Sequence, residues 1–258
     1  MKTLLAITTY LKNQALREII RSLIEFDYHT GNTILICDDA AGGAKEVYEE
    51  YKDKCDLHLV YGKHRVGIAK NKNRGIKYFL ENPGFSHIMM LDDDIEFIKA
   101  GGIQSLLESL EGSNLPHQTA YLGDYSHPKT GQGFFHEFKP IQEDEYTYWC
   151  KGCQGILIFL PRKTAEEVGY FSTDWKSHYG YEHAEYAARI NTFYATEPQL
   201  FPIWKRSYKY FKTQLIPNNY EANHLPNAPI YDQKLARIRQ GLGLVWKESG
   251  LDKKETVI

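Results

Sequence analysis

An α/β fold, with a mostly parallel central sheet flanked by helices, is the fold class that the sequence predicts. Apolar runs of strand length alternate through the first half of the chain with amphipathic segments of helical length, which is typical of repeated strand–helix–strand units. Polar residues stand directly after three of these runs. Because ligands of doubly wound sheets bind beyond the carboxyl ends of the strands, these polar residues are expected to meet in one crevice.

The expected elements of the first half follow one another in a regular order. The strands are short apolar runs, the helices carry apolar residues at helical spacing, and the turns Gly42-Gly43 and Asn82-Pro83-Gly84 break the chain. The predicted elements are strand Leu4–Thr9, helix Asn13–Phe26, strand Thr33–Cys37, a helix ending near Lys54, strand Leu57–Val60, helix Ile68–Leu80 and strand His87–Leu91. After Ser113 short strands and aromatic loops are expected, with helices again at Glu182–Asn191 and Tyr231–Trp246.

Composition and charge narrow the classes of function. The chain has 258 residues and a formal net charge of −2, which gives it no general attraction to nucleic acids or acidic membranes. No apolar stretch approaches the roughly 18 residues of a membrane span, and the four cysteines fit a reducing compartment, so a cytoplasmic location is expected. The sequence lacks G-x-x-x-x-G-K-[ST], and G-x-G-x-x-G is missing after the first strand, which disfavours a P-loop kinase or a dinucleotide dehydrogenase.

Asp92-Asp93-Asp94 is the most informative motif, because it directly follows the strand predicted at His87–Leu91. Alternate residues of a strand face the same side, so Asp92 and Asp94 can share a pocket. Carboxylates packed this closely repel one another, and a divalent cation with oxygen ligands relieves the repulsion. The alternative is an acidic turn that caps the following helix.

Five segments in order resemble the GT-A nucleotide-sugar glycosyltransferases of the family-two type. They are Ile7-Thr8-Thr9-Tyr10, Cys37-Asp38-Asp39, Gly67–Gly75, Leu91-Asp92-Asp93-Asp94 and Gly180–Glu185. The resemblance spans Thr3 to Arg189. It implies a single GT-A (Rossmann-like) domain over residues 1–258, with a nucleotide-binding half at about 1–112. The rest, about 113–258, would form a smaller mixed acceptor-binding half and a C-terminal helical extension.

The resemblance implies a set of nucleotide-binding residues. Thr8 and Tyr10 would lie beside the nucleotide, and one carboxylate of Asp38-Asp39 would accept a hydrogen bond from the base; a helix cap is the alternative for Asp39. Further candidates are Asp93 and, in the helix after Gly67, Lys70, Lys72, Asn73 and Arg74. Since helical residues point in different directions, only one or two members of the helix are expected to face inward.

The acidic triplet would hold the metal in this family. Asp92 would lie beside the ribose and the metal, and Asp94 would be the direct ligand of Mn²⁺ or Mg²⁺. The metal would bind both phosphates of the leaving diphosphate. His224 is the expected third ligand. His178 and His183 compete with it, and a histidine with an ordinary hydrogen-bonding role is the alternative.

The segment Gly180–Glu185 resembles the acidic motif that serves the acceptor. Glu182 and Glu185 are neighbours on one helix face, and one of them would deprotonate the acceptor hydroxyl. The sequence has His183 where an Asp usually stands, so the base is left open between Glu182, His183 and Glu185. A helix start that is acidic because of its dipole is the alternative, and Arg189 is placed to pair with Glu185.

Two further motifs have ordinary explanations. Cys150-Lys151-Gly152-Cys153 lacks a second C-x-x-C, so its cysteines are expected to be packing residues, and Trp149–Gly155 is expected to form the floor beneath the donor sugar. The stretch Trp204–Lys212 interleaves basic and aromatic residues, which indicates an edge strand or a carbohydrate-stacking loop more than a nucleic-acid-binding patch.

These observations together predict a metal-dependent glycosyltransferase. It would move a sugar from a nucleoside diphosphate, with UDP expected, to a hydroxyl of a saccharide, lipid-linked or other acceptor. Inversion at the anomeric carbon is favoured, and retention stays open. A nucleotidyltransferase and a non-catalytic carbohydrate- or nucleic-acid-binding module are the alternatives.

Overall fold

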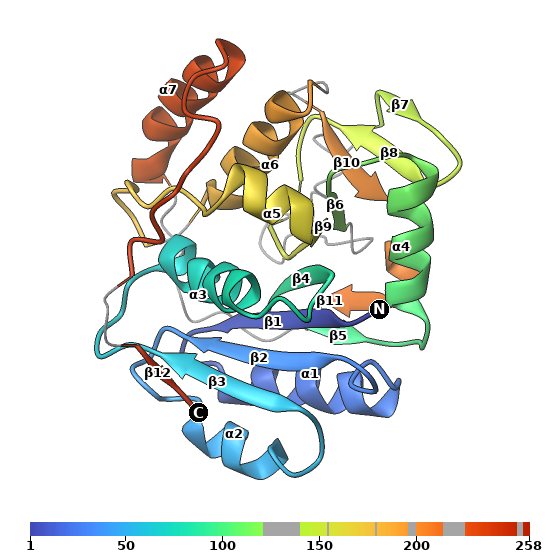
Figure 1. The fold of residues 1–258 in the computed structure, drawn as a ribbon, viewed down its shortest axis with the longest axis vertical. Helices are drawn as coiled ribbons and strands as arrows, with labels where there is room; N and C mark the ends of the chain where they lie inside the picture. The colour runs from blue at the N-terminus through green and yellow to red at the C-terminus, as the bar shows by residue number, and fades with distance from the viewer. Residues whose placement is uncertain (121–139, 154, 179, 196–199, 214–224, 252–254) are drawn as a thin grey trace, which may run out of the picture.

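A mixed sheet with parallel strands on one side runs through the protein (Figure 1). The computed structural model describes residues 1–120, 140–153, 155–178, 180–195, 200–213, 225–251 and 255–258. Within these ranges ten strands form one sheet in the order β12-β3-β2-β1-β4-β9-β6-β10-β8-β7, and β11 and β5 form a separate pair.

The bounds of the elements are as follows. The strands are β1 (Thr3–Thr9), β2 (Thr33–Asp38), β3 (Leu57–Tyr61), β4 (His87–Asp92), β5 (Ile95–Phe97), β6 (Gln118–Ala120), β7 (Gln142–Glu143), β8 (Thr147–Cys150), β9 (Leu157–Pro161), β10 (Phe201–Trp204), β11 (Phe211–Thr213) and β12 (Thr256–Val257). The helices are α1 (Asn13–Glu25), α2 (Lys45–Tyr51), α3 (Ile68–Glu81), α4 (Gly102–Gly112), α5 (Arg162–Val168), α6 (Glu182–Phe193) and α7 (Ala228–Arg239), with short 3₁₀ helices η2 (Ser207–Lys209) and η3 (Leu225–Asn227).

The register of the parallel strands brings their carboxyl ends together. Strand β1 lies between β2 and β4 and is parallel to both, so that Thr8 is level with Cys37 on one side and with Asp92 on the other. The chain then returns antiparallel in β9, which pairs with β4. The polar residues that follow β1, β2 and β4 therefore meet at one edge of the sheet, as the sequence predicts.

Apolar side chains of the central strands point alternately to the two faces of the sheet, and helices cover both faces. Leu5 and Ile7 face the cluster formed with α1, α2 and α4, whereas Leu4 and Ala6 face the cluster formed with α3, α5 and α6. Figure 1 shows α1 and α2 on one side of β1–β3 and α3 on the other. The site at the strand ends is thus built on a rigid, doubly covered support.

Most elements of the first half end within three residues of their predicted bounds, and the predicted α/β fold class is confirmed. Helix α7 is the clearest difference, because it covers Ala228–Arg239 rather than Tyr231–Trp246. Gly241 and Gly243 adopt φ values of +74° and +70°, which end the helix.

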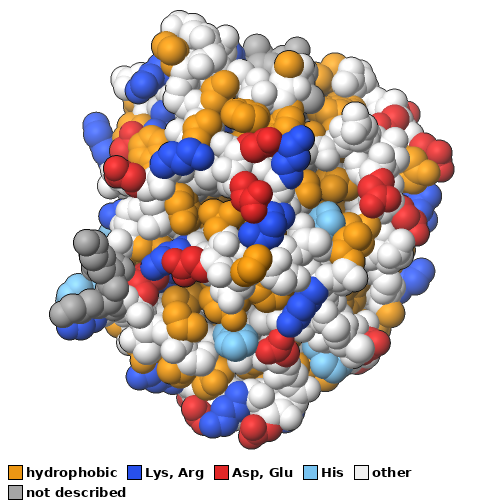
Figure 2. Space-filling model, in the orientation of Figure 1, with side chains coloured by type: hydrophobic (Ala, Val, Ile, Leu, Met, Phe, Trp, Pro, Cys, Tyr) orange, Lys and Arg blue, Asp and Glu red, His pale blue; other side chains and the backbone are white. Residues whose placement is uncertain are grey.

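The surface carries charges of both signs. Figure 2 shows acidic and basic side chains interspersed over the face seen there. Among the described helices, none is long and apolar enough to cross a membrane.

Candidate active site

The acidic triplet lies at the end of β4, and the neighbouring strand β1 holds its first two members. The hydroxyl of Thr8 donates to Asp92 Oδ1 at 2.8 Å, and that of Thr9 donates to Asp93 Oδ2 at 2.7 Å. Lys12 Nζ lies 3.0 Å from Asp93 Oδ1. Asp93 is therefore bonded to β1 and to the start of α1. Asp92, by contrast, is also in contact with α3, as described below.

Asp94 is less well satisfied. Its Oδ1 atom is buried and has no hydrogen-bond partner among the described residues. Burial, followed by the negative charge of Asp92, raises the pKa of Asp94 from 3.8 to about 6, although the positive charge of Lys12 opposes the change. A buried carboxylate oxygen without a partner is suited to binding a cation.

Lys72 of α3 lies between the triplet and α6. Its fully buried ammonium group is 3.1 Å from Asp92 Oδ1 and donates to Glu182 Oε1 at 3.0 Å. Burial lowers the pKa of Lys72, but the negative charges of Asp92 and Glu182 raise it by more, so this pKa lies above its usual value. Of the cationic candidates on α3, Lys72 is the one that the structure brings to the acidic triplet.

Helix α6 begins directly after a strained backbone position. Tyr181 has a φ of +69°, a left-handed conformation that bulky residues rarely adopt and that often marks functional sites. Glu182 follows it with Oε1 bound to Lys72, while Oε2 is buried without a hydrogen-bond partner in the described part of the chain. Glu182 is thus the acid of this segment that joins the cluster of Asp92 and Lys72.

The other two candidate bases are placed differently. His183 is 4% exposed, its ring nitrogens have no hydrogen-bond partners among the residues that the structure describes, and burial lowers its pKa well below the ordinary value. Glu185 is 2% exposed and binds Arg189 through both oxygens, at 2.7 and 3.3 Å. Arg189 also donates to the carbonyl of Tyr170 at 2.8 Å. The expected pairing of Glu185 with Arg189 is confirmed. Through Arg189, Glu185 helps to hold α6 to the segment after α5.

The segment around the two neighbouring cysteines packs over the start of α6. A Cβ atom on Gly155 would lie 2.9 Å from His183 Nδ1, so the close approach needs glycine. The carbonyl of Gly155 also lies 3.4 Å from Lys72 Nζ. Cys150 and Cys153 are free thiols, and burial raises their pKa values to about 11 and about 12. The segment therefore borders the cluster, and its contact with a donor sugar stays a prediction.

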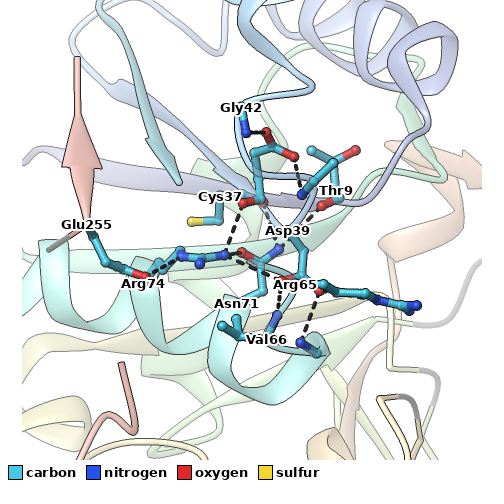
Figure 3. A network of polar contacts seen from close by, with 12 residues as sticks. Thr9, Cys37, Asp39, Gly42, Arg65, Val66, Asn71, Arg74 and Glu255 are labelled. Atoms are coloured by element: carbon cyan, nitrogen blue, oxygen red, sulfur yellow. Dashed lines mark hydrogen bonds and ion pairs between the residues drawn. The ribbon is translucent and has the colours of Figure 1, made fainter. Parts of the chain in front are cut away.

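The carboxylates at the end of β2 bind loop backbone (Figure 3). Asp38 accepts from the N–H groups of Ala40, Gly42 and Ala44 at 2.8, 2.8 and 3.2 Å. Asp39 accepts from Val66 at 2.7 Å and from Gly67 at 3.0 Å. Both acids therefore hold loops at the sheet edge, and the prediction that one of them accepts a hydrogen bond from a base is not tested by these contacts.

The remaining candidates of α3 face other parts of the protein. Asn73 donates to the carbonyls of Phe171 and Ser249 at 3.0 and 2.9 Å, and fully buried Arg74 donates to Glu255 at 2.7 Å. Lys70 is half-buried. The structure does not bring Asn73 and Arg74 to the acidic triplet, and their predicted contact with a nucleotide stays a prediction.

Tyr10 lies at the end of β1 beneath a basic side chain. The guanidinium carbon of Arg65 is 4.0 Å from the centroid of the Tyr10 ring, and Arg65 Nε is 3.7 Å from Asp39 Oδ2. Sequence reasoning missed Arg65 and Lys12. The available signal was position alone, since Lys12 follows β1 by three residues and Arg65 stands two residues before Gly67.

Two of the three predicted metal ligands, Asp92 and Asp94, lie within the described residues. Within the described ranges, no group of three or more His, Cys, Asp or Glu residues is arranged to hold a metal ion. His224 lies outside the described residues, and His178 packs against Gly67. Asp92 and Asp94 fit a hard divalent cation, because both present carboxylate oxygens and Asp94 Oδ1 has no partner among the described residues.

Comparison with models of known protein families identifies the family to which the chain belongs. Residues 5–168 match the model described as glycosyl transferase family 2, which is more than half of the chain. The protein therefore belongs to glycosyl transferase family 2 and is a glycosyltransferase. The predicted family and enzyme class are confirmed. Comparison with curated protein sequences gives no match.

Solved structures with the same fold include proteins from two organisms. TarS 1–349 from S. aureus in complex with UDP is 16% identical with a TM-score of 0.60, and the match covers 93% of this chain and 71% of that one. A longer TarS structure is 15% identical with a TM-score of 0.60, and 42% of it is covered, against 93% of this chain. Mannosyltransferase PcManGT from Pyrobaculum calidifontis, in complex with GDP-Man and Mn²⁺, is 15% identical with a TM-score of 0.62, with 92% of this chain and 64% of that chain covered. At these identities the likeness shows the fold.

Proposed function

We propose that the protein transfers a sugar from a nucleoside diphosphate sugar, with UDP as the nucleotide, to an acceptor hydroxyl in a divalent-metal-dependent reaction that inverts the anomeric carbon. One observation carries the assignment of roles. Among the candidate bases, Glu182 is the one that faces the acidic triplet through Lys72, and its second oxygen is buried without a partner among the described residues.

Glu182 would act as the general base. Its carboxylate would take the proton of the acceptor hydroxyl while the acceptor oxygen attacks the anomeric carbon and the bond from that carbon to the phosphate oxygen breaks. One carboxylate on the acceptor side is sufficient for this single displacement, which supports inversion. His183 and Glu182 are both buried, at 4% and 6% exposed, but the His183 ring makes no hydrogen bond to the cluster among the described residues. Glu185 is not suited, because Arg189 engages both of its oxygens.

The triplet would hold the donor end of the reaction. Asp92 and Asp94 would ligate Mn²⁺ or Mg²⁺, which would supply Lewis-acid stabilisation of the leaving diphosphate. Lys72 keeps Asp92 and Glu182 in place, since its ammonium group bonds to both of them. Thr8 orients Asp92 through a hydrogen bond of 2.8 Å to Oδ1. UDP as the donor nucleotide is supported by the UDP complex of TarS, whereas PcManGT is in complex with GDP-Man and Mn²⁺.

The donor can be identified before any acceptor is known. Nucleoside diphosphates and nucleotide sugars are added to the protein with Mn²⁺ or with EDTA, and thermal stabilisation and hydrolysis of the sugar are measured. We expect UDP and a UDP-sugar to stabilise the protein only when Mn²⁺ is present. Stabilisation by GDP alone among the diphosphates would refute the choice of nucleotide, and stabilisation that EDTA does not change would refute the metal dependence.

A matched pair of variants tests the base. Glu182→Gln keeps the shape and the contact with Lys72, and we expect it to lower transfer by about 10²–10⁴-fold with unchanged diphosphate binding. Glu185→Gln is the control, which should lose thermal stability because Arg189 becomes a buried unpaired charge, while each folded molecule retains transfer. The opposite pattern, with transfer lost only in Glu185→Gln, would move the role of base to Glu185.

A further inference from the structure

The segment from Gly241 onward leaves α7 and returns to the nucleotide-binding half. Trp246 pairs with Gly169, and the backbone carbonyl of Ser249 accepts a hydrogen bond from Asn73 at 2.9 Å. Strand β12 then pairs antiparallel with β3 and extends the sheet beyond it. Figure 1 shows the segment after α7 coming down to the level of α3, and β12 at the edge of the sheet. The end of the described chain is thus attached to α3 and β3 together.

Glu255 makes the most consequential contact of this segment. Its side chain is almost fully buried and lies 2.7 Å from Arg74 Nε, and the Arg74 side chain is 0% exposed. Arg74 also donates to the carbonyl of Asp38 at 3.0 Å and to Asn71 Oδ1 at 2.6 Å. Asn71 in turn donates to the carbonyl of Cys37 at 2.8 Å. Glu255 therefore belongs to a buried network that holds the end of β2 against α3 (Figure 3).

A second carboxylate competes for the same guanidinium group. Asp39 Oδ1 lies 3.6 Å from Arg74, but Asp39 uses its oxygens to accept the N–H groups of Val66 and Gly67. Because Glu255 is the nearer counter-charge, Asp39 remains available to hold this loop. Arg65, in the same loop, covers the ring of Tyr10.

We propose that Glu255 is a positioning residue for the nucleotide site: by neutralising Arg74 it leaves Asp39 to hold the loop of Arg65–Gly67 beside Tyr10. Without Glu255, the buried guanidinium group draws Asp39 toward it, and the backbone N–H groups of the loop lose their acceptor. Glu255 does not touch the acidic triplet in this arrangement. It therefore acts on donor affinity and leaves the chemical step unchanged.

The inference rests on the proposed nucleotide-sugar function, and it predicts a separation of KM from kcat. Glu255→Gln is compared with wild type by calorimetric titration with UDP and GDP in Mn²⁺ and by donor hydrolysis. We expect the Kd for the diphosphate and the KM for the donor to rise at least tenfold, with kcat changed less than threefold, and Glu255→Asp to recover part of the affinity. Glu46→Gln is the control, because it breaks an ion pair of equal length, 2.7 Å to Arg17, in the same half but on the surface.

A double variant covers the case in which Glu255→Gln does not fold. Arg74→Met with Glu255→Gln leaves no unpaired buried charge and nothing to draw Asp39 from the loop, so diphosphate affinity in the folded double variant should return to within about threefold of wild type. Wild-type affinity in Glu255→Gln, or affinity that stays at least tenfold weak in the folded double variant, would overturn the role of Glu255. Failure of wild type to bind either diphosphate would instead overturn the proposed function, and this inference with it.

Discussion

Replacing Asp94 with asparagine should stabilise the metal-free protein while abolishing its activity. The substitution keeps the size of the side chain and removes a charge that lies in a buried position beside Asp92, with Oδ1 lacking a hydrogen-bond partner in the described residues. A site built for a cation is unfavourable for its own carboxylates when the cation is absent. Stability and activity are therefore expected to change in opposite directions.

The pKa of Asp94 sets the magnitude and the pH range. Burial and the charge of Asp92 raise this pKa from 3.8 to about 6. The folded protein thus holds the proton more tightly than the unfolded chain does, so the free energy of unfolding falls as the pH rises from about 4 to about 6 and stays lower above that. At about 1.4 kcal/mol per pKa unit, Asp94→Asn should gain up to about 3 kcal/mol at pH 7.5, or a rise in Tm of about 5–10 °C.

Urea unfolding in EDTA at pH 4.5 and pH 7.5 measures this effect, and donor hydrolysis with Mn²⁺ measures activity. Glu96→Gln is the matched control, a carboxylate-to-amide change two residues further on in a partly exposed pair with Lys212, which should alter stability by less than about 1 kcal/mol. The reasoning is refuted if Asp94→Asn is less stable than wild type at pH 7.5 without metal, or if it retains full metal-dependent hydrolysis.

Three further expectations concern the same site. Mn²⁺ affinity measured by calorimetry should fall about tenfold per pH unit below pH 6, because protons compete for Asp94, whose pKa is about 6, and a flat profile would exclude Asp94 as a ligand. Lys72→Met should cost about 3–5 kcal/mol in urea unfolding, because two buried carboxylates lose their shared cation; wild-type stability would contradict this. Gly67→Ala should lower the Tm and weaken diphosphate binding in the same titrations, since φ is +86° there and a Cβ would lie 2.9 Å from a histidine nitrogen; an unchanged Tm would show that the loop adapts.

Sequence periodicity was sufficient for the central fold because local patterns and the final packing agree there. The apolar run at Leu4–Thr9 and the helical spacing at Ile68–Leu80 correspond to β1 and α3 with small changes in their bounds. The helix expected at Tyr231–Trp246 was displaced, because Gly241 and Gly243 end α7 early. The two glycines near the end of the apolar pattern were better evidence for the end of the helix than Trp246 was for its continuation.

The candidate site was predicted in outline but not in its partners. The sequence places Asp92 and Glu182 in motifs, yet it does not show that Lys72 joins them, because this contact connects positions 110 residues apart. It also leaves the base open between Glu182, His183 and Glu185, and the contacts of Lys72 with Glu182 and of Arg189 with Glu185 distinguish the two glutamates. Which carboxylate stays available for chemistry is decided by which cation lies beside it, and that is a property of tertiary structure.

The attachment of Glu255 to Arg74 also bears on how the protein is made. These two residues are 181 positions apart, and domains begin to fold from the N-terminus during synthesis. Strands β1, β2 and β4 can pair as they emerge, but the guanidinium group of Arg74 remains without its nearest counter-charge until Glu255 has been translated. Closing so long a loop is slow compared with local contacts, so the contact between α3 and the end of β2 is expected to reach its final order late, after the rest of the sheet has formed.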